Sequence, residues 1–302
     1  MRDDSNERDV QQPTTDGGYA TALNIGSEQV SGSTTWYRQL LVVAETEYRL
    51  AVRSRWAIAL TVIFTAFALG LTTFSGSSVS PVGFERTVAS LAVLAVYLVP
   101  LVALAFSYDA IVGREESGWL QTLFALPVSR GWLVVGTVVG RAIVIACAIL
   151  VGFGIAGGLL LSEFGLASAD TYVQFMLVTV GLGIVFLVVG VLISTLAREK
   201  THALGVSLLA WAWFVLVHDL LGLGLIAAFD LPEFAVSGMV LANPTGIYRA
   251  LVLGSLGASG DAGFASILAE SGLSPTILAM TLLAWIIVPT VLATLTIRGR
   301  RV

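Results

Sequence analysis

Three ionisable residues stand inside long apolar stretches of the chain. Arg141 lies in the stretch 133–161, and His218 and Asp219 lie in the stretch 203–229. An ionisable group in hydrocarbon is costly, so each one is a candidate for function. Arg141 could instead extend its stem to the headgroups, and Asp219 could form an interhelical hydrogen bond that fixes packing. We favour these two structural interpretations.

The chain lacks the spacings that hydrolytic and ATP-binding enzymes need. It contains no H-E-x-x-H, no G-x-S-x-G and no G-x-x-x-x-G-K-[ST]. Its two histidines, His202 and His218, do not make a metal pair on their own. We therefore expect no catalytic, metal or cofactor site in this chain. Any ATP that drives it must bind to a partner subunit.

The segment 107–130 combines acids with apolar residues at helical spacing. We take as its candidate binding residues Tyr108, Asp109, Gly113, Arg114, Glu115, Glu116, Gly118, Trp119, Leu123, Pro127 and Arg130. Trp119, Leu123 and Leu126 predict a short amphipathic helix that stops at Pro127. Such a helix is suited to docking a soluble partner, with the acids setting orientation and Trp119 as the buried anchor. The alternative is a solvated loop.

The composition places these segments in a membrane protein. Of 302 residues, 56% are hydrophobic and 12% are charged, against about 25% charged in ordinary soluble domains. The mean hydropathy is +0.89. Soluble, fibrous and disordered classes are excluded, and the lone Cys147 excludes a disulfide framework. Residues 1–35 are polar, and we expect them to form a disordered cytoplasmic tail.

Six apolar stretches are long enough to cross a bilayer as helices of about 20 residues. They lie at about 56–75, 87–106, 133–161, 172–196, 203–229 and 276–296. With both termini in the cytoplasm, inside segments hold eleven basic residues and outside segments hold Arg86 and Arg249. This asymmetry predicts an all-α polytopic fold with both ends inside. At 1.5 Å per residue, Asp219 lies about 24 Å along the fifth span, in its outer half.

Two further segments predict short helices outside the spans. The segment 230–275 is broken by Asn243-Pro244 and carries Arg249, so we expect two outer helices, about 232–242 and 245–256, rather than a seventh span. Residues 36–55 predict an amphipathic helix in the cytoplasmic interface, with Glu47 as the exception on its apolar face. The alternative is an ordinary extension of the first span. Gly136 and Gly140 match the small-xxx-small motif for close helix packing.

The charged segment resembles the loop between the second and third spans of ABC-2 type permeases. That pattern is Tyr-Asp-x-Ile-x-Gly, an acid/Arg cluster, Gly-x-Leu and Leu-Pro-Val-Ser-Arg, and it is found here in 108–130. The residues around Asp219 at 213–224, Asn243-Pro244 and Tyr248-Arg249 resemble the NosY-like branch more narrowly. The resemblance covers about residues 36–302 and implies one permease domain, in which 107–130 is the coupling helix for a separate ATPase.

On this resemblance we expect the permease subunit of an ATP-driven transporter in the cell membrane. The implied partners are a NosF-like ATPase, a second copy of the chain and the lipid bilayer, in a system that matures nitrous oxide reductase. A NosD-like extracytoplasmic protein is a further candidate, and no nucleic-acid partner is expected. The alternative is a non-transporting scaffold that acts mechanically on an outer partner through 230–275. ATP-dependent solute flux would separate the two.

Overall fold

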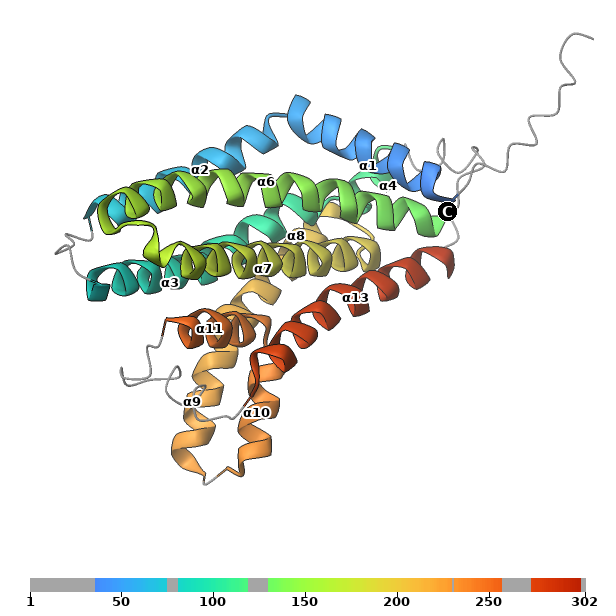
Figure 1. Ribbon diagram of the computed structural model, residues 1–302. Coiled ribbons are helices and arrows are strands. Elements are labelled where there is room, and N and C mark those ends of the chain that lie inside the picture. Colours follow the sequence, from blue (N-terminus) through green and yellow to red (C-terminus); the bar gives the residue numbers. More distant parts are fainter. Residues whose placement is uncertain (1–35, 75–80, 119–129, 230, 257–272, 300–302) are drawn as a thin grey trace, which may run out of the picture. The chain divides into compact units, whose positions relative to one another are not determined.

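The architecture is organised around one long helix, α6, against which the first two helices pack end to end (Figure 1). The computed structural model describes residues 36–74, 81–118, 130–229, 231–256 and 273–299. Within these ranges the regular elements are all helical, and they are α1 (Trp36–Arg53), α2 (Trp56–Phe74), α3 (Pro81–Ser107), α4 (Val112–Glu116), α6 (Arg130–Phe164), η1 (Leu166–Ser168), α7 (Ala169–Leu196), α8 (Lys200–Ala212), η2 (Trp213–Val217), α9 (His218–Ala228), α10 (Glu233–Leu241), α11 (Pro244–Ser255) and α13 (Pro275–Gly299).

Glycines on α6 make this close packing possible. A Cβ on Gly140 would lie 2.5 Å from the Cβ of Glu47, and one on Gly136 would lie 2.6 Å from the Cβ of Val43. Farther along α6, a Cβ on Gly152 would lie 2.5 Å from the Cβ of Phe64. The first pair seats α1, and Gly152 seats α2. The small-xxx-small motif therefore serves packing within the chain, as its spacing indicates.

A local break separates α1 from α2 and lets each follow its own part of α6. Arg55 has a φ of 62°, in the left-handed region that residues with a Cβ rarely adopt. The chain therefore turns at this residue instead of continuing as one helix (Figure 1). The predicted helix over 36–55 is confirmed as a helix, ending at Arg53. Its position in the membrane interface stays a prediction.

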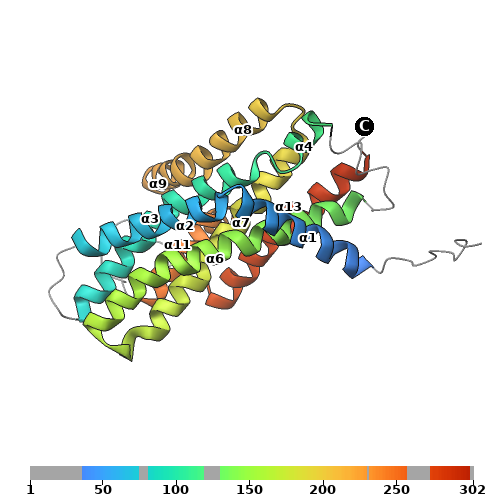
Figure 2. The same ribbon diagram turned by 90° about the horizontal axis from the view of Figure 1, so that it is seen from above.

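The core lies where α3, α6 and α7 run side by side (Figures 1 and 2). Large apolar side chains from all three helices are fully buried there, including Leu91, Phe153 and Phe186. The Tyr172 hydroxyl donates to the carbonyl oxygen of Phe153 at 2.6 Å, which fixes α7 against α6. In the most apolar window of α7, 61% of the residues are buried. Among the six candidate spans of the described residues, α7 is therefore the most enclosed.

The prediction of six spans is confirmed for the described residues. Six helical runs are long and apolar enough to cross a membrane, and they begin at Trp56, Gly83, Arg130, Ala169, Lys200 and Pro275. The fifth joins α8, η2 and α9 into 29 residues, and only 11% of its most apolar window is buried. The two short helices predicted between the fifth and last spans are confirmed as α10 and α11.

Candidate functional site

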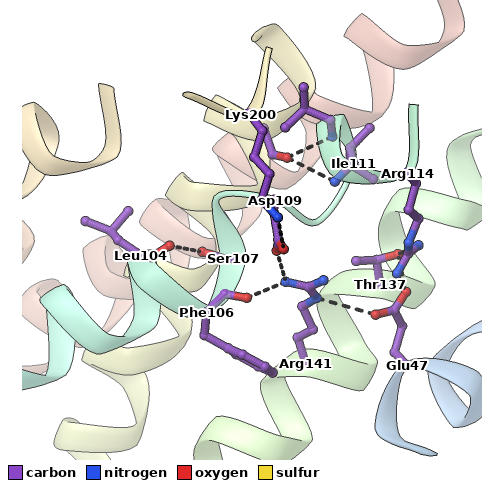
Figure 3. A network of polar contacts seen from close by, with 12 residues as sticks. Glu47, Leu104, Phe106, Ser107, Asp109, Ile111, Arg114, Thr137, Arg141 and Lys200 are labelled. Carbon is purple, nitrogen blue, oxygen red and sulfur yellow. Dashed lines mark hydrogen bonds and ion pairs between the residues drawn. The ribbon is translucent and has the colours of Figure 1, made fainter. Parts of the chain in front are cut away.

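The centre of the first polar cluster is Glu47, a buried carboxylate on α1 (Figure 3). Its side chain is 5% exposed and forms an ion pair with Arg114 of α4. Its Oε1 also accepts a hydrogen bond from the Thr137 hydroxyl at 3.2 Å, and Thr137 in turn accepts one from Arg114 at 3.2 Å. The carboxylate, the guanidinium and the hydroxyl therefore join α1, the start of segment 107–130, and α6.

Arg141 occupies the other side of the same carboxylate, one turn along α6 from Thr137 (Figure 3). Its Nε lies 3.4 Å from Glu47 Oε2, and its Nη1 lies 3.3 Å from Asp109 Oδ1. Nη1 also donates to the carbonyl oxygen of Phe106, and the guanidinium carbon lies 5.2 Å from the centroid of that residue's ring. The guanidinium is enclosed by protein, so the expected extension to lipid headgroups is not what the structure shows.

Asp109 and Lys200 connect this cluster to the N-terminal end of the fifth span. The ammonium of Lys200 lies 3.5 Å from Asp109 Oδ2 and 5.8 Å from the centroid of the Tyr108 ring. The backbone N–H of Lys200 donates to Glu116 Oε1 at 2.7 Å. This N–H is the first of α8 and has no partner within its own helix. A carboxylate at a helix N-terminus is stabilised by the helix dipole, so Glu116 acts as a cap supplied by another element.

A buried hydroxyl on α7 anchors the turn between α3 and α4. Ser194 is fully buried, and its Oγ accepts hydrogen bonds from the N–H groups of Ile111 and Val112 at 2.9 and 3.1 Å. Beside this turn, Glu47, Asp109, Arg114, Arg141 and Lys200 help to line a cavity of about 300 Å³. The start of segment 107–130 is thus held to α1, α6, α7 and α8 at once.

The structure brings together most of the described residues that the sequence marks in this segment. Gly113 packs beside Asp109, since a Cβ there would lie 3.4 Å from the Asp109 Cβ. Glu115 is half-buried at the end of α4, Gly118 has a φ of 71°, and Arg130 begins α6. Trp119, Leu123, Leu126 and Pro127 lie outside the described residues. The amphipathic helix expected there therefore stays a prediction.

A second polar cluster forms where α11 meets the fifth span, and Asn243 is its centre. Asn243 is fully buried, and its Oδ1 accepts from the N–H of Thr245 at 3.0 Å, which caps α11. Pro244 occupies the first turn of α11, where its missing N–H costs nothing. The Nδ2 of Asn243 donates to the carbonyl oxygen of Phe214 at 2.9 Å. The Asn-Pro pair is thus both a helix start and a tie between helices.

The carbonyl of Phe214 is available because the fifth span contains a π turn over Trp213–Val217. A π turn shifts the helical hydrogen bonds by one residue, and such turns are frequently found at functional sites. The hydroxyl of Thr245 donates to the same oxygen at 3.0 Å. The ring of Phe214 packs edge-on to Phe186 and Trp285, with centroids 5.9 and 5.5 Å away. Hydrogen bonds from α11 therefore fix the backbone of Phe214, and aromatic contacts fix its side chain.

The ionisable residues of the fifth span complete this cluster. Asp219 forms an ion pair with Arg249 of α11, and the two side chains are 15% and 19% exposed. The Nδ2 of Asn243 lies 3.2 Å from Asp219 Oδ1 and 3.1 Å from His218 Nδ1. Residues that lie far apart in sequence, namely His218, Asp219, Asn243 and Arg249, therefore meet in one place. The packing role expected for Asp219 is consistent with these contacts.

Several members of the two clusters were not among the residues that the sequence marked for function. The sequence could have indicated Glu47, since a single acid on an otherwise apolar helix face indicates a buried cationic partner. It indicates Lys200 more weakly, as the only lysine of the chain. It does not indicate the hydroxyl residues Thr137, Ser194 and Thr245, because hydroxyls are common in membrane helices and reveal no partner.

The sequence of this chain is similar to those of known membrane transport proteins. Residues 41–298 match the family described as ABC-2 family transporter protein. A Stutzerimonas stutzeri protein described as "Probable ABC transporter permease protein NosY" is 36% identical over 281 residues, which cover 87% of this chain and 99% of that protein. A protein of the same description from Pseudomonas aeruginosa strain PAO1 is 34% identical over 252 residues, covering 80% of this chain and 92% of that protein.

Proposed function

The chain belongs to the ABC-2 transporter family, and from that premise we propose that it couples to a separate ATPase through segment 107–130. Family membership and the six apolar helices make it a multi-pass membrane protein, the transmembrane permease subunit of an ABC transporter. ATP is bound by the partner and not by this chain, in keeping with the absence of a phosphate-loop motif from the sequence.

The observation that carries the proposal is the ion pair between Arg114 and Glu47. Arg114 belongs to the segment on which an ATPase would press, whereas Glu47 belongs to α1 and shares its carboxylate with Arg141 of α6. Breaking a buried pair by moving one partner away costs about 3–5 kcal/mol, so the three parts move together more easily than apart. A displacement of the segment by the ATPase therefore moves α1 and α6 together, so the motion is transmitted as a rigid-body movement.

The remaining partners follow from the similarity to proteins named NosY. A NosF-like ATPase would dock on segment 107–130, and a second copy of the chain would complete the membrane unit. A NosD-like extracytoplasmic protein would meet the outer side, where we place α10 and α11. In this assembly the chain would serve the maturation of nitrous oxide reductase.

One observation favours a second function, a mechanical subunit that moves no solute. Both carboxylate oxygens of Asp219 face partners within the chain, Oδ1 near Asn243 and Oδ2 at Arg249. Polar groups that line a solute path must exchange these contacts for the solute. A cluster that is already satisfied serves packing better than conduction.

The docking test is co-purification of the chain with its NosF-like ATPase in lipid nanodiscs. If Trp119 is an interface anchor, Trp119→Ala should cost about 2 kcal/mol, which is a loss of affinity of about 30-fold. The control is Leu166→Ala, because Leu166 is 79% exposed and we place it on the outer side. Unchanged affinity in Trp119→Ala and Leu123→Ala together would remove this segment as the docking site. ATP-dependent solute flux in vesicles separates transport from the mechanical function.

A further inference from the structure

The inner end of the fifth span is attached to segment 107–130 by both the backbone and the side chain of one residue. The N–H of Lys200 donates to Glu116 at 2.7 Å, and its ammonium lies 3.5 Å from Asp109. The ammonium also lies over the ring of Tyr108. Glu116, Asp109 and Tyr108 all belong to the segment. A displacement of the segment therefore pulls or pushes α8 at its first residue.

Little of the fifth span is packed inside the protein, although Ala203 and Ser207 are buried and the Trp211 indole donates to the carbonyl oxygen of Tyr97 at 3.1 Å. Its most apolar window is 11% buried, against 61% for α7. Leu209, Leu220 and Leu221 are all at least half exposed. A hydrogen-bonded helix is stiff along its axis, and a helix with few buried side chains can tilt without repacking the core. Figure 1 shows α9 and α10 extending away from the side-by-side helices α3, α6 and α7.

The middle of the fifth span, in contrast, is fixed to the core. The carbonyl oxygen of Phe214 accepts hydrogen bonds from Asn243 and Thr245 at the start of α11. That helix is itself anchored, since Tyr248 is fully buried and its hydroxyl lies 3.1 Å from the hydroxyl of Thr179 on α7. The π turn supplies the carbonyl that makes this attachment possible.

These three observations give the fifth span the parts of a lever, and we propose that it works as one. Segment 107–130 moves its inner end, the contact between Phe214 and Asn243 is the pivot, and the outer end of α9 is the output. Glu116 and Asn243 are then positioning residues for ATP-driven motion. Lys200 to Phe214 and Phe214 to Ala228 each span about 21 Å at 1.5 Å per residue. Equal arms give outer displacements of about the same size as the inner ones, in the opposite direction.

This inference rests on the proposed function, because the ATPase supplies the motion. The test uses the chain with its ATPase in nanodiscs, in a Cys147→Ser background. Spin labels at Phe229→Cys and Leu159→Cys report the distance from the output end to α6, because both sites are exposed. A second pair, at His202→Cys and Leu41→Cys, reports the inner end. Distances are measured without nucleotide and after trapping with ATP and vanadate.

The variants separate the input from the pivot. Glu116→Ala removes the acceptor for the Lys200 N–H, and Glu116→Gln retains an acceptor oxygen. Glu199→Ala is the matched control, because it removes an acid beside Lys200 and leaves the bond between Glu116 and Lys200 in place. Asn243→Ser retains a helix cap but is too short to reach Phe214.

We expect ATP trapping to change both distances in the parent, in Glu116→Gln and in Glu199→Ala. Glu116→Ala should lose at least half of both changes when distances are compared among complexes that hold the ATPase. Asn243→Ser should keep the inner change and lose at least half of the outer one. Outer changes of parental size in both Glu116→Ala and Asn243→Ser would overturn the lever. The lever would also be overturned if the parent binds the ATPase and hydrolyses ATP but shows no change in the outer distance. That result would leave the proposed function standing. Failure of the parent to bind the ATPase overturns both.

Discussion

Neutralising Glu47 should loosen α1 from the rest of the protein. Its carboxylate is 5% exposed and faces two guanidinium groups, those of Arg114 and Arg141. Glu47→Gln keeps the shape and removes the charge, so the ion pairs of Glu47 with Arg114 and Arg141 are lost, while Arg141 keeps its contact with Asp109. Removing one partner of a buried pair costs about 3–5 kcal/mol. For a chain of this size 1 kcal/mol shifts the melting temperature by about 2 °C, which predicts a fall of about 6 °C or more.

The matched control lies on the same helix. Glu45 is 60% exposed and pairs with Arg49 one turn away, an exposed contact that contributes about 0.3–0.5 kcal/mol. Glu45→Gln should therefore lower the melting temperature by about 1 °C or less. Thermal unfolding in nanodiscs, followed by tryptophan fluorescence, measures both. A fall of similar small size in the two variants would refute the claim that Glu47 holds the first polar cluster together.

A double-mutant cycle then assigns the energy to one contact. Glu47→Gln and Arg114→Gln are measured singly and together, and contacting residues couple by about 0.5–3 kcal/mol. We expect the double variant to be less destabilised than the sum of the two single ones. Additive effects would mean that the ion pair contributes no energy of its own.

Three further predictions concern the packing of α6, the ion pair between Asp219 and Arg249, and the topology. Gly140→Ala should destabilise the fold by about 1–3 kcal/mol, because its Cβ would lie 2.5 Å from that of Glu47, whereas Gly158→Ala has open space and should be neutral or stabilising in the same thermal assay. Asp219→Leu and Arg249→Met should each lower the yield of folded protein, and the double variant should recover part of it, because no unpaired charge remains. The topology is tested with four single cysteines, each placed in a Cys147→Ser background. An impermeant thiol reagent added outside should label Ser168→Cys and Ser259→Cys and should leave Ser129→Cys and Thr201→Cys unlabelled. Labelling of Thr201→Cys would contradict the six-span topology.

The spans could be predicted from the sequence because their signal is local. A run of about 20 apolar residues must be a helix in a bilayer, since every backbone group has to be satisfied within the segment. The same rule placed the break at Asn243-Pro244, which the structure shows as the junction of α10 and α11. Charge counts predict the orientation, and that part stays a prediction.

The pairing of the helices could not be predicted in this way, because membrane helices share one composition and do not specify their neighbours. Arg141 shows the consequence. Its position near the end of a span suggested an extended side chain, but α1 lies alongside α6 and delivers Glu47 to it. The contact joins residues 94 positions apart. The one usable clue was Glu47 itself, whose place on an apolar face had no explanation within its own helix.

The π turn of the fifth span could not be predicted from the sequence, and the second polar cluster depends on it. Nothing in Trp213–Val217 departs from an ordinary apolar helix, and the extra residue in the turn is stabilised from outside. Asn243 and Thr245 supply that stabilisation by bonding the carbonyl of Phe214. The sequence did place Asp219 in one motif, and Asn243 with Arg249 in another. The contacts among these three residues join the two motifs in one polar cluster, and they follow from the route of the chain between α9 and α11.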